Sequence, residues 1–226
     1  MNIAIIDTES TGVDLRAEPI SVCILLLEVD QVKGTLIREL DRYVGFRYPS
    51  VPIHRLARAK HGITRDSLAG KEFDTTRIAE ILGKAEVLIA HNSSFDARMM
   101  NVVWPDIAKK DWLCSCSNWP WPALDSRKLD SVCRYFDIDR PKIHSALGDC
   151  EALRHALLKH SGKTEQSRTY LALLLRKTPQ QHSYEAPYRV APELTIPQPE
   201  TNAWAIWLVV LAFIVVAVIV LLLNLN

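Results

Sequence analysis

Residues 3–12 read IAIIDTESTG, and this stretch decides the fold that we expect for the chain. Its first four residues are apolar, which is typical of a strand buried on both faces. Two acids, Asp7 and Glu9, follow at alternate positions, so their side chains project to the same side of the strand. Two carboxylates at the end of a core strand repel each other and are costly to desolvate unless a cation joins them. The stretch therefore favours a cation-binding strand end over a strand that merely runs out into a polar loop.

Length and composition set broad limits. The 226 residues allow one domain of ordinary size with additional segments. The formal net charge of +1 argues neither for nor against a nucleic-acid partner. The five cysteines match neither a disulfide framework nor a zinc finger, so we interpret them as thiols in a reducing compartment that faces the cytosol.

The C-terminal part of the sequence has a different character. Five of the twelve prolines fall between residues 179 and 199, which is typical of a linker. Residues 203–223 read AWAIWLVVLAFIVVAVIVLLL, a run of 21 residues without a charge. Such a run, as a helix, spans a hydrocarbon layer of about 30 Å. A buried core helix is the alternative, although a core helix of a small domain is rarely apolar all round.

We therefore predict three parts along the chain. A folded domain occupies residues 1–177, a Pro-rich linker occupies residues 178–202, and a single transmembrane anchor occupies residues 203–223. Asp7 and Glu9 interrupt the apolar core that an N-terminal signal sequence would need. We therefore expect the folded domain to stay on the cytosolic side of the membrane.

The hydrophobic pattern predicts an α/β domain. Residues 20–30 and 36–44 look like two further strands joined by a short turn, so the first three strands are expected to be antiparallel neighbours. Two later strands are expected at residues 87–90 and 112–115. Helices are expected at residues 54–59, 74–83, 95–103, 128–136, 145–160 and 168–176. The result is a mixed five-stranded sheet flanked by helices.

Acidic residues lie at the ends of three of these elements. Asp7 and Glu9 end the first strand, Asp96 follows the strand at residues 87–90, and Asp149 lies at the start of a long helix. His144 comes five residues before Asp149. Each has an ordinary explanation alone, such as a first-turn acid favoured by the helix dipole or a solvated loop histidine. Their joint order and spacing make coincidence a poor explanation.

Three segments that carry these residues resemble the three motifs of the DEDDh, or DnaQ-like, 3′→5′ exonucleases: residues 7–12 (DTESTG), 91–96 (HNSSFD) and 144–149 (HSALGD). This superfamily includes the proofreading subunit of bacterial replicative polymerase, RNase T and the three-prime repair exonucleases of animals, which are also membrane-anchored. Its tyrosine subclass would need Tyr where Ser145 stands, so the histidine subclass is the match. The resemblance covers about residues 2–162 and implies an RNase H-like fold.

The resemblance also implies a site for two divalent cations, Mg²⁺ with Mn²⁺ as a substitute. Carboxylate oxygens are natural ligands of such hard ions. The implied ligands are Asp7, which bridges the two ions, and Glu9, Asp96 and Asp149. His144 is the implied general base, since the unperturbed pKa of histidine lies near neutral pH.

Other residues are candidates for holding the substrate. The residues expected at the terminal nucleotide are Thr8, Thr11, Gly12, His61 and Asn92; His61 opens the segment HGIT, which resembles the family segment beside that nucleotide. Arg127, Lys128, Arg140 and Lys142 either track the backbone of a single strand or are ordinary solvated charges. Trp119 and Trp121 either stack on bases or pack within their proline-rich loop.

The predicted function is a metal-dependent 3′→5′ exonuclease. It would hydrolyse phosphodiester bonds at the 3′ end of single-stranded DNA, release nucleoside monophosphates and be tethered to a lipid bilayer through residues 203–223. DNA is favoured because the resemblance extends to the membrane-anchored repair enzymes. The alternatives are an RNA-processing 3′→5′ exoribonuclease and a non-catalytic module that binds nucleic-acid ends. The complete set of four acids and His144 argues against the module, since a binder does not need that histidine.

Overall fold

Five strands form a single mixed sheet in a computed structural model that describes residues 1–140, 144–162 and 167–182. The strands are β1 (Asn2–Ser10), β2 (Pro19–Val29), β3 (Leu36–Phe46), β4 (Val87–Ala90) and β5 (Trp112–Cys114), in the spatial order β3-β2-β1-β4-β5. β1 pairs antiparallel with β2, as does β2 with β3, whereas β4 runs parallel to both β1 and β5. The predicted mixed sheet with three antiparallel leading strands is therefore confirmed.

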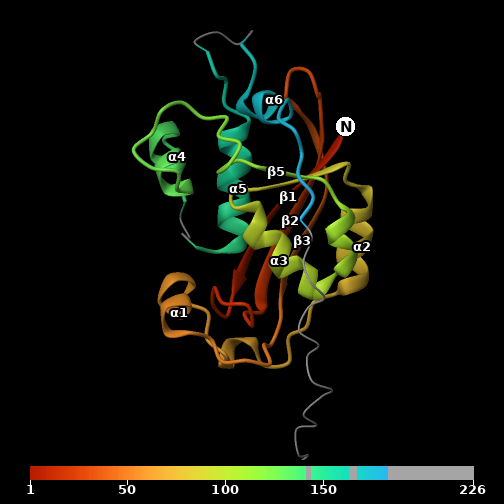
Figure 1. The fold of residues 1–226 in the computed structure, drawn as a ribbon, viewed down its shortest axis with the longest axis vertical. Coiled ribbons are helices and arrows are strands. Elements are labelled where there is room, and N and C mark those ends of the chain that lie inside the picture. Colours follow the sequence, from red (N-terminus) through yellow and green to blue (C-terminus); the bar gives the residue numbers. More distant parts are fainter. Residues whose placement is uncertain (141–143, 163–166, 183–226) are drawn as a thin grey trace, which may run out of the picture. The chain divides into compact units, whose positions relative to one another are not determined.

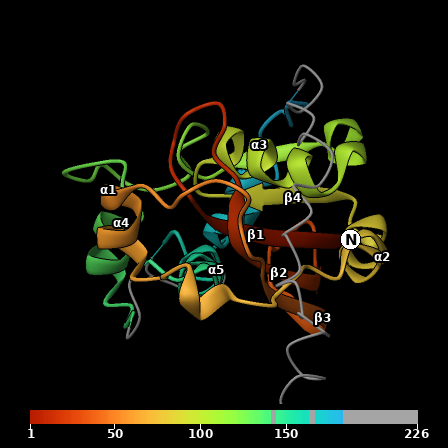
Figure 2. The same cartoon turned by 90° about the horizontal axis from the view of Figure 1, so that it is seen from below.

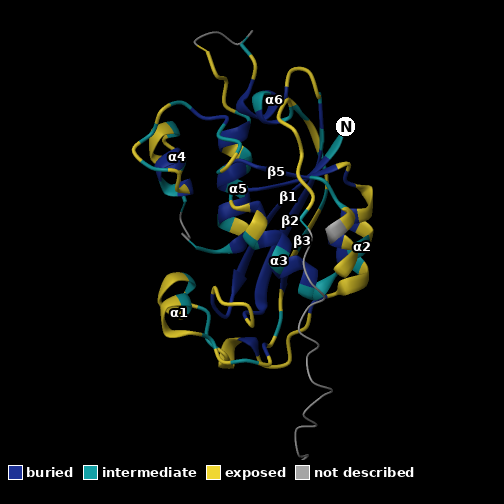
Figure 3. Ribbon diagram, viewed as in Figure 1, coloured by how far each residue is buried: buried dark blue, intermediate teal, exposed yellow. Residues whose placement is uncertain are grey.

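Helices cover both faces of this sheet (Figures 1 and 2). They are α1 (Arg55–His61), η1 (Asp66–Leu68), α2 (Thr75–Lys84), α3 (Ser93–Val103), η2 (Pro105–Lys109), α4 (Leu129–Phe136), α5 (Ala146–Leu157) and α6 (Tyr170–Leu174). α2 and α3 pack on one face, whereas α5 packs on the other with α4 and α6 beside it. Figure 3 shows the buried sheet between these two layers, while α1 remains exposed.

The alternation of side chains along β1 divides the core into two apolar layers. Ala4 and Ile6 face the layer that contains α2 and α3. Ile3 and Ile5 face the opposite layer, which contains α5. Continuing this alternation sends Asp7 towards α5 and Thr8 towards α3. The period of the strand thus determines which helix each polar residue at its end can reach.

The chain beyond α5 also belongs to the folded core. Tyr170, Leu171 and Leu174 of α6 are buried in the same apolar layer as α5. Further on, Gln180 exchanges two backbone hydrogen bonds of 2.8 Å with Trp112 of β5. These contacts extend the folded core well beyond residue 162, where the family resemblance of the sequence ends.

The predicted membrane anchor lies outside the described residues. Within residues 1–140, 144–162 and 167–182, no helix has the length and apolar character needed to cross a bilayer. Residues 203–223 and most of the predicted linker at residues 178–202 lie outside the described residues. The three predicted parts of the chain therefore stay predictions.

Trp119, Trp121 and most of the cysteines pack in or against the hydrophobic core. The Trp121 side chain is buried against Phe136 and Tyr170, so packing rather than base stacking explains this residue. Trp119 is half-buried and donates its indole N–H to the Pro122 carbonyl at 3.1 Å. All five cysteines are free thiols, and only Cys116 is partly exposed.

Replacing a buried leucine of α6 should destabilise the whole domain. We expect Leu171→Ala to lower the free energy of unfolding by about 2–5 kcal/mol, because the substitution leaves a cavity in the layer beneath α5. Chemical denaturation of the purified chain measures this change. Leu15→Ala is the matched control, since Leu15 is 90% exposed and its truncation should change stability by less than about 0.5 kcal/mol. Equal stability of the two variants would show that α6 does not belong to the cooperative core.

Candidate active site

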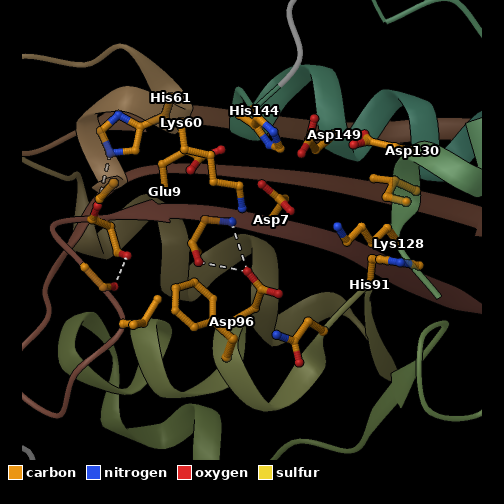
Figure 4. A pocket seen from close by; sticks show the side chains of 18 of the residues that line it. Asp7, Glu9, Lys60, His61, His91, Asp96, Lys128, Asp130, His144 and Asp149 are labelled. Carbon is orange, nitrogen blue, oxygen red and sulfur yellow. Dashed lines mark hydrogen bonds between the residues drawn. The ribbon is translucent and has the colours of Figure 1, made fainter. Parts of the chain in front are cut away.

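Four carboxylates from three elements meet at one edge of the sheet. Asp7 and Glu9 lie at the C-terminal end of β1, Asp96 lies in the first turn of α3, and Asp149 lies in the first turn of α5. They line a cleft of about 780 Å³. Figure 4 shows Asp7, Glu9 and Asp149 pointing towards one another, with His144 beside Asp149. The structure therefore brings together all five residues that the sequence predicts as catalytic.

Local sequence explains why the two helices begin at this edge. The hydroxyl of Ser145 caps α5 by accepting a hydrogen bond from the Gly148 N–H at 3.2 Å. The cap residue of α3 is Asn92, so Asp96 falls in the first turn of that helix, as Asp149 does in α5. Acids are favoured there by the partial positive charge of the helix N-terminus. The same geometry aims both carboxylates at the end of β1.

His144 occupies a backbone conformation that its residue type rarely adopts. Its φ angle of 57° lies in the left-handed region, immediately before the cap of α5. Holding a residue other than glycine there costs about 1–2 kcal/mol. Burial and the charge of Lys60 both lower the pKa of His144, so its ring is neutral at pH 7 and free to accept a proton.

Three of the carboxylates have the geometry of a cation site. Asp7, Glu9 and Asp149 each offer an oxygen, and these oxygens lie within 4.8 Å of one another. Oxygen ligands bind Mg²⁺ and Ca²⁺ at about 2.0–2.6 Å, so oxygens on opposite sides of one ion lie about 4–5 Å apart. An all-oxygen donor set of this size fits a hard divalent cation. Asp96 lies outside this group of three but is close enough for its charge to raise the pKa of Asp7.

The cluster lacks enough positive charge of its own. Burial raises the pKa of Asp7 well above its usual value, and the charges of Asp96 and Asp149 raise it further. Burial likewise raises the pKa of Glu9 to about 7, although the charge of Lys60 opposes the shift. Burial also raises the pKa of Asp96 to about 7. Carboxyl groups that resist ionisation to this extent are the ones that a bound divalent cation would stabilise most.

Thr8 holds Asp96 in place from the other face of β1. Its backbone N–H and its hydroxyl both donate to Oδ1 of Asp96, at 3.0 and 2.8 Å. Both bonds favour the ionised carboxylate and oppose the effect of burial on its pKa. Oδ2 of Asp96 takes no part in these two bonds, so it is the oxygen that suits a ligand.

Arg140 has a different position from the one expected of a solvated charge. Only 5% of its side chain is exposed, and its guanidinium forms ion pairs with Asp130 of α4 and Asp149 of α5. It therefore joins α4 to α5 and orients Asp149, and it is not free to track a nucleic-acid backbone. Its sequence position gives no signal of this role, because the pairing depends on how α4 and α5 pack.

The residues predicted to hold the terminal nucleotide divide into two groups. Thr8, Gly12, His61 and Asn92 line the cleft, although the Thr8 side chain is already bound to Asp96. Thr11 is absent from the cleft lining found among the described residues. It is buried, and its hydroxyl accepts a hydrogen bond from the Glu18 N–H at 2.9 Å. Thr11 thus stabilises the turn after β1 from the side that faces away from the cleft.

His61 fastens α1 to the end of β1. Its Nδ1 accepts a hydrogen bond from the Ile63 N–H at 3.0 Å, so in the neutral ring Nε2 carries the hydrogen and donates it to the Ser10 carbonyl at 3.2 Å. The His54 N–H donates to the Thr11 carbonyl at 2.7 Å and provides a second attachment. Both ends of α1 are therefore tied to the turn that follows the catalytic strand.

Sequence reasoning missed several residues of the cleft. Lys60 lies next to Glu9 in the cleft (Figure 4). Val13, Leu56 and Phe95 add apolar lining at the same end. Lys60, Val13 and Phe95 are each adjacent in sequence to a predicted residue, whereas Leu56 is five residues from His61. Proximity to a predicted motif could therefore have indicated most of these cleft residues, although their residue types gave no reason to select them.

A protein-family model described as "Exonuclease" matches residues 4–157, which is more than half of the chain. The chain therefore belongs to this exonuclease family. The predicted enzyme class, a 3′→5′ exonuclease that acts as a phosphodiester hydrolase, is confirmed, as is the DEDD superfamily to which the resemblance pointed. Members of this family depend on divalent metal, and the acidic cluster fits that requirement.

Curated relatives are much longer proteins. The chain is 30% identical over 165 residues to the PolC-type DNA polymerase III of Bacillus subtilis (strain 168), an alignment that covers 69% of this chain and 11% of the polymerase. It is 29% identical over 166 residues to the corresponding polymerase of Halalkalibacterium halodurans, covering 69% of this chain and 12% of that protein. The chain thus spans about a tenth of the length of these relatives.

Solved structures share the fold. A structure of E. coli exonuclease I with single-stranded DNA superposes with a TM-score of 0.56 at 14% identity, covering 70% of this chain and 40% of the other. Exonuclease X in complex with 5′-overhanging duplex DNA gives a TM-score of 0.52 at 23% identity, covering 75% and 99%. These likenesses establish the exonuclease fold over the described core.

The acidic cluster makes stability depend on pH and on divalent metal. In chelator, the folded state binds more protons than the unfolded state between about pH 4 and 7, because folding raises the pKa values of Glu9 and Asp96 to about 7. We therefore expect the cluster to contribute less stability as pH rises through this range. Added Mn²⁺ or Mg²⁺ should raise Tm more at pH 8 than at pH 5, because the ligands must be deprotonated to bind. Differential scanning fluorimetry measures both effects.

A matched pair of variants separates the site from the rest of the surface. Glu9→Gln should weaken the metal-induced rise in Tm, whereas Glu72→Gln, at an exposed position, should leave it unchanged. An equal rise in Tm for Glu9→Gln and the unaltered chain would exclude Glu9 as a metal ligand.

Proposed function

We propose that this chain is a metal-dependent enzyme that removes nucleoside monophosphates one at a time from the 3′ end of single-stranded DNA. The observation that carries the proposal is the convergence of Asp7, Glu9, Asp96 and Asp149 on one cleft with His144 at its edge. No simple structural role requires four carboxylates at a buried sheet edge, since their mutual repulsion disfavours ionisation.

In this proposal, the four carboxylates are the ligands of two cations. Asp7, Glu9 and Asp149 would hold the first ion, and Asp7 with Oδ2 of Asp96 would hold a second. When bound, Mg²⁺ ions in such a pair supply charge that stabilises the attacking and leaving oxygens of an in-line displacement. Thr8 and Arg140 keep the outer carboxylates oriented throughout.

His144 moves the proton in this proposal. Its ring is neutral at pH 7, because burial lowers its pKa, so a ring nitrogen can accept the proton of the attacking water. Attack on the last phosphodiester then breaks the bond between phosphorus and the 3′ oxygen, which takes a proton from solvent. The shortened strand ends in a 3′-hydroxyl, and the released nucleotide carries a 5′-phosphate. The cleft end near Gly12, His61 and Asn92 is where that nucleotide would sit.

DNA is the proposed substrate because relatives and structural neighbours point to it. The curated relatives are DNA polymerases, and the exonuclease I and exonuclease X structures contain DNA. The alternative is an RNA-processing exoribonuclease, which would use the same carboxylate chemistry. The experiment below distinguishes the two substrates.

The decisive experiment compares DNA and RNA of one sequence. The full chain, purified in mild detergent, would be incubated with 5′-labelled single-stranded oligonucleotides, with Mg²⁺, with Mn²⁺ or with chelator. We expect a metal-dependent ladder that shortens DNA from its 3′ end faster than RNA. Asp7→Asn and His144→Ala should each lower the rate at least about 100-fold, because they remove a metal ligand and the general base.

Matched variants control for non-specific damage. Asp106→Asn and His155→Ala alter the same residue types outside the cleft lining and should leave the rate unchanged. Faster digestion of RNA than of DNA would show that RNA, and not DNA, is the preferred substrate. Intact oligonucleotides in every metal condition, from a chain that is folded by circular dichroism, would favour the non-catalytic binding module.

We further propose that a single-pass C-terminal anchor tethers the enzyme to a membrane with the exonuclease domain facing the cytosol. The support is the uncharged run of 21 residues at positions 203–223, which is preceded by a Pro-rich stretch. In fractionated cells, the full chain should remain with the membranes after an alkaline wash, and deletion of residues 203–223 should release it. Deletion of residues 183–202 is the control and should not release it. Retention of the chain without residues 203–223 would overturn the anchor.

A further inference from the structure

The helix α1 has an unusual environment for a helix of a folded domain. None of its residues is buried, and its last turn holds Arg58, Lys60 and His61. Figure 3 shows it exposed, apart from the two layers that cover the sheet. The hydrogen bonds at its two ends attach it to the turn after β1, at the edge of the cleft. A helix without a buried face usually depends on a partner or on its attachments for a defined position.

The segment that contains α1 is strongly basic. Residues 47–71 hold six basic residues against one acid, Asp66; the basic residues are Arg47, Arg55, Arg58, Lys60, Arg65 and Lys71. This concentration contrasts with a net charge of +1 for the whole chain. The cleft itself is rich in carboxylates, so the basic charge lies beside the cleft and not within its acidic centre.

The basic residues of α1 form no ion pairs within the described protein, although the charge of Lys60 acts on Glu9 and His144. Within the described parts of the chain, no ion pair involves Arg55, Arg58 or Lys60. By contrast, Arg47 pairs with Glu18, and the guanidinium of Arg65 lies over the Tyr48 ring at 4.7 Å. The three side chains on α1 are exposed, and they are therefore available to an anionic partner.

Helix geometry connects these side chains to the cleft. Leu56 and Lys60 are four residues apart, so they share a face of α1, and both line the cleft. Arg55 and Arg58 are three residues apart and share the face of α1 that lies roughly opposite, outside the cleft lining. A strand that leaves the cleft across α1 would pass from Lys60 to this arginine pair.

Exposed apolar side chains lie at the same end of the cleft. Val13 is 84% exposed and Leu56 is 63% exposed, and both line it. The loop that carries Val13 is held in place, because Arg98 donates to the carbonyls of Val13 and Asp14 at 3.1 and 2.7 Å. Apolar surface for bases beside cations for phosphates is the combination that binds single-stranded nucleic acid.

We propose that α1 is the surface over which the substrate strand leaves the cleft, with Arg55 and Arg58 contacting phosphates that lie outside it. This inference rests on the proposed function, because it assigns a path to the substrate of the same site. An anionic lipid surface would also attract Arg55 and Arg58. Nucleic acid is favoured because the helix shares its other face, through Leu56 and Lys60, with the cleft.

Binding to a single strand tests the path directly. The full chain with Asp7→Asn, in detergent, would be titrated into a 5′-fluorescein-labelled DNA of twelve nucleotides while anisotropy is recorded at several salt concentrations. Adding Arg55→Gln with Arg58→Gln should weaken binding about tenfold at low salt. It should also reduce the slope of log K against log salt by about 1.4, since each lost contact to a single strand contributes about 0.7. Arg176→Gln with Lys177→Gln is the control, because it removes the same charge from exposed positions after α6 and should change neither value.

Activity on two substrates separates this inference from the proposed function. The 4-nitrophenyl ester of thymidine 5′-monophosphate contains one phosphodiester and no upstream strand. In the chain with an intact Asp7, the double arginine variant should cleave this ester at the unaltered rate, while kcat/KM for the twelve-nucleotide DNA falls about tenfold. An unaltered chain that cleaves neither substrate would refute the proposed function.

Two further outcomes would overturn the path over α1 alone. One is a double arginine variant that binds and digests the long DNA as well as the unaltered chain does. The other is a variant with normal DNA binding that no longer binds a short-chain, water-soluble phosphatidylserine. That second result would make α1 a lipid-binding surface.

Discussion

The repulsion among carboxylates at the end of β1 is the constraint on which the rest of the structure depends. Asp7 and Glu9 continue a strand that is otherwise buried, and Asp149 reaches them from α5. Burial and like charge together raise the pKa values of Asp7 and Glu9, which is the expected effect of placing acids in a protein interior. A fold can keep such a cluster only if the elements that carry it are stabilised elsewhere.

The two apolar layers provide that stabilisation, and they also determine the orientation of the cluster. Because side chains alternate along β1, one layer fixes Asp7 against α5 while the other fixes Thr8 against α3. Arg140 adds the only buried cation that contacts the cluster in the described parts of the chain, and it does so through Asp149. One guanidinium cannot balance four carboxylates, so the site remains a strong attractor for divalent cations.

Local pattern was sufficient to predict the sheet order at its antiparallel end, whereas the five clustered residues were predicted from the resemblance of three segments to the exonuclease motifs. Each of these depends on where a strand or helix ends, and apolar runs, turn residues and the Ser145 cap mark those ends in the sequence. Contacts between distant segments were not predictable in this way. The burial of Thr11 against Glu18 and the pairing of Arg140 with Asp130 arise only when separate loops pack together. For the same reason the sequence marked α6 as a helix without showing that it completes the core.

The distribution of charge around the cleft follows from the same constraint. In the proposed reaction, the carboxylates needed for cleavage repel a polyanionic strand, and bound cations would offset this repulsion only at the centre of the cleft. Affinity for the remainder of the strand must therefore come from basic groups outside the cluster. If those groups were paired with acids, as Arg140 is, they would have little charge left to offer. Arg55 and Arg58 meet this requirement, because they are exposed on a helix that lines the cleft and form no ion pair in the described parts of the chain.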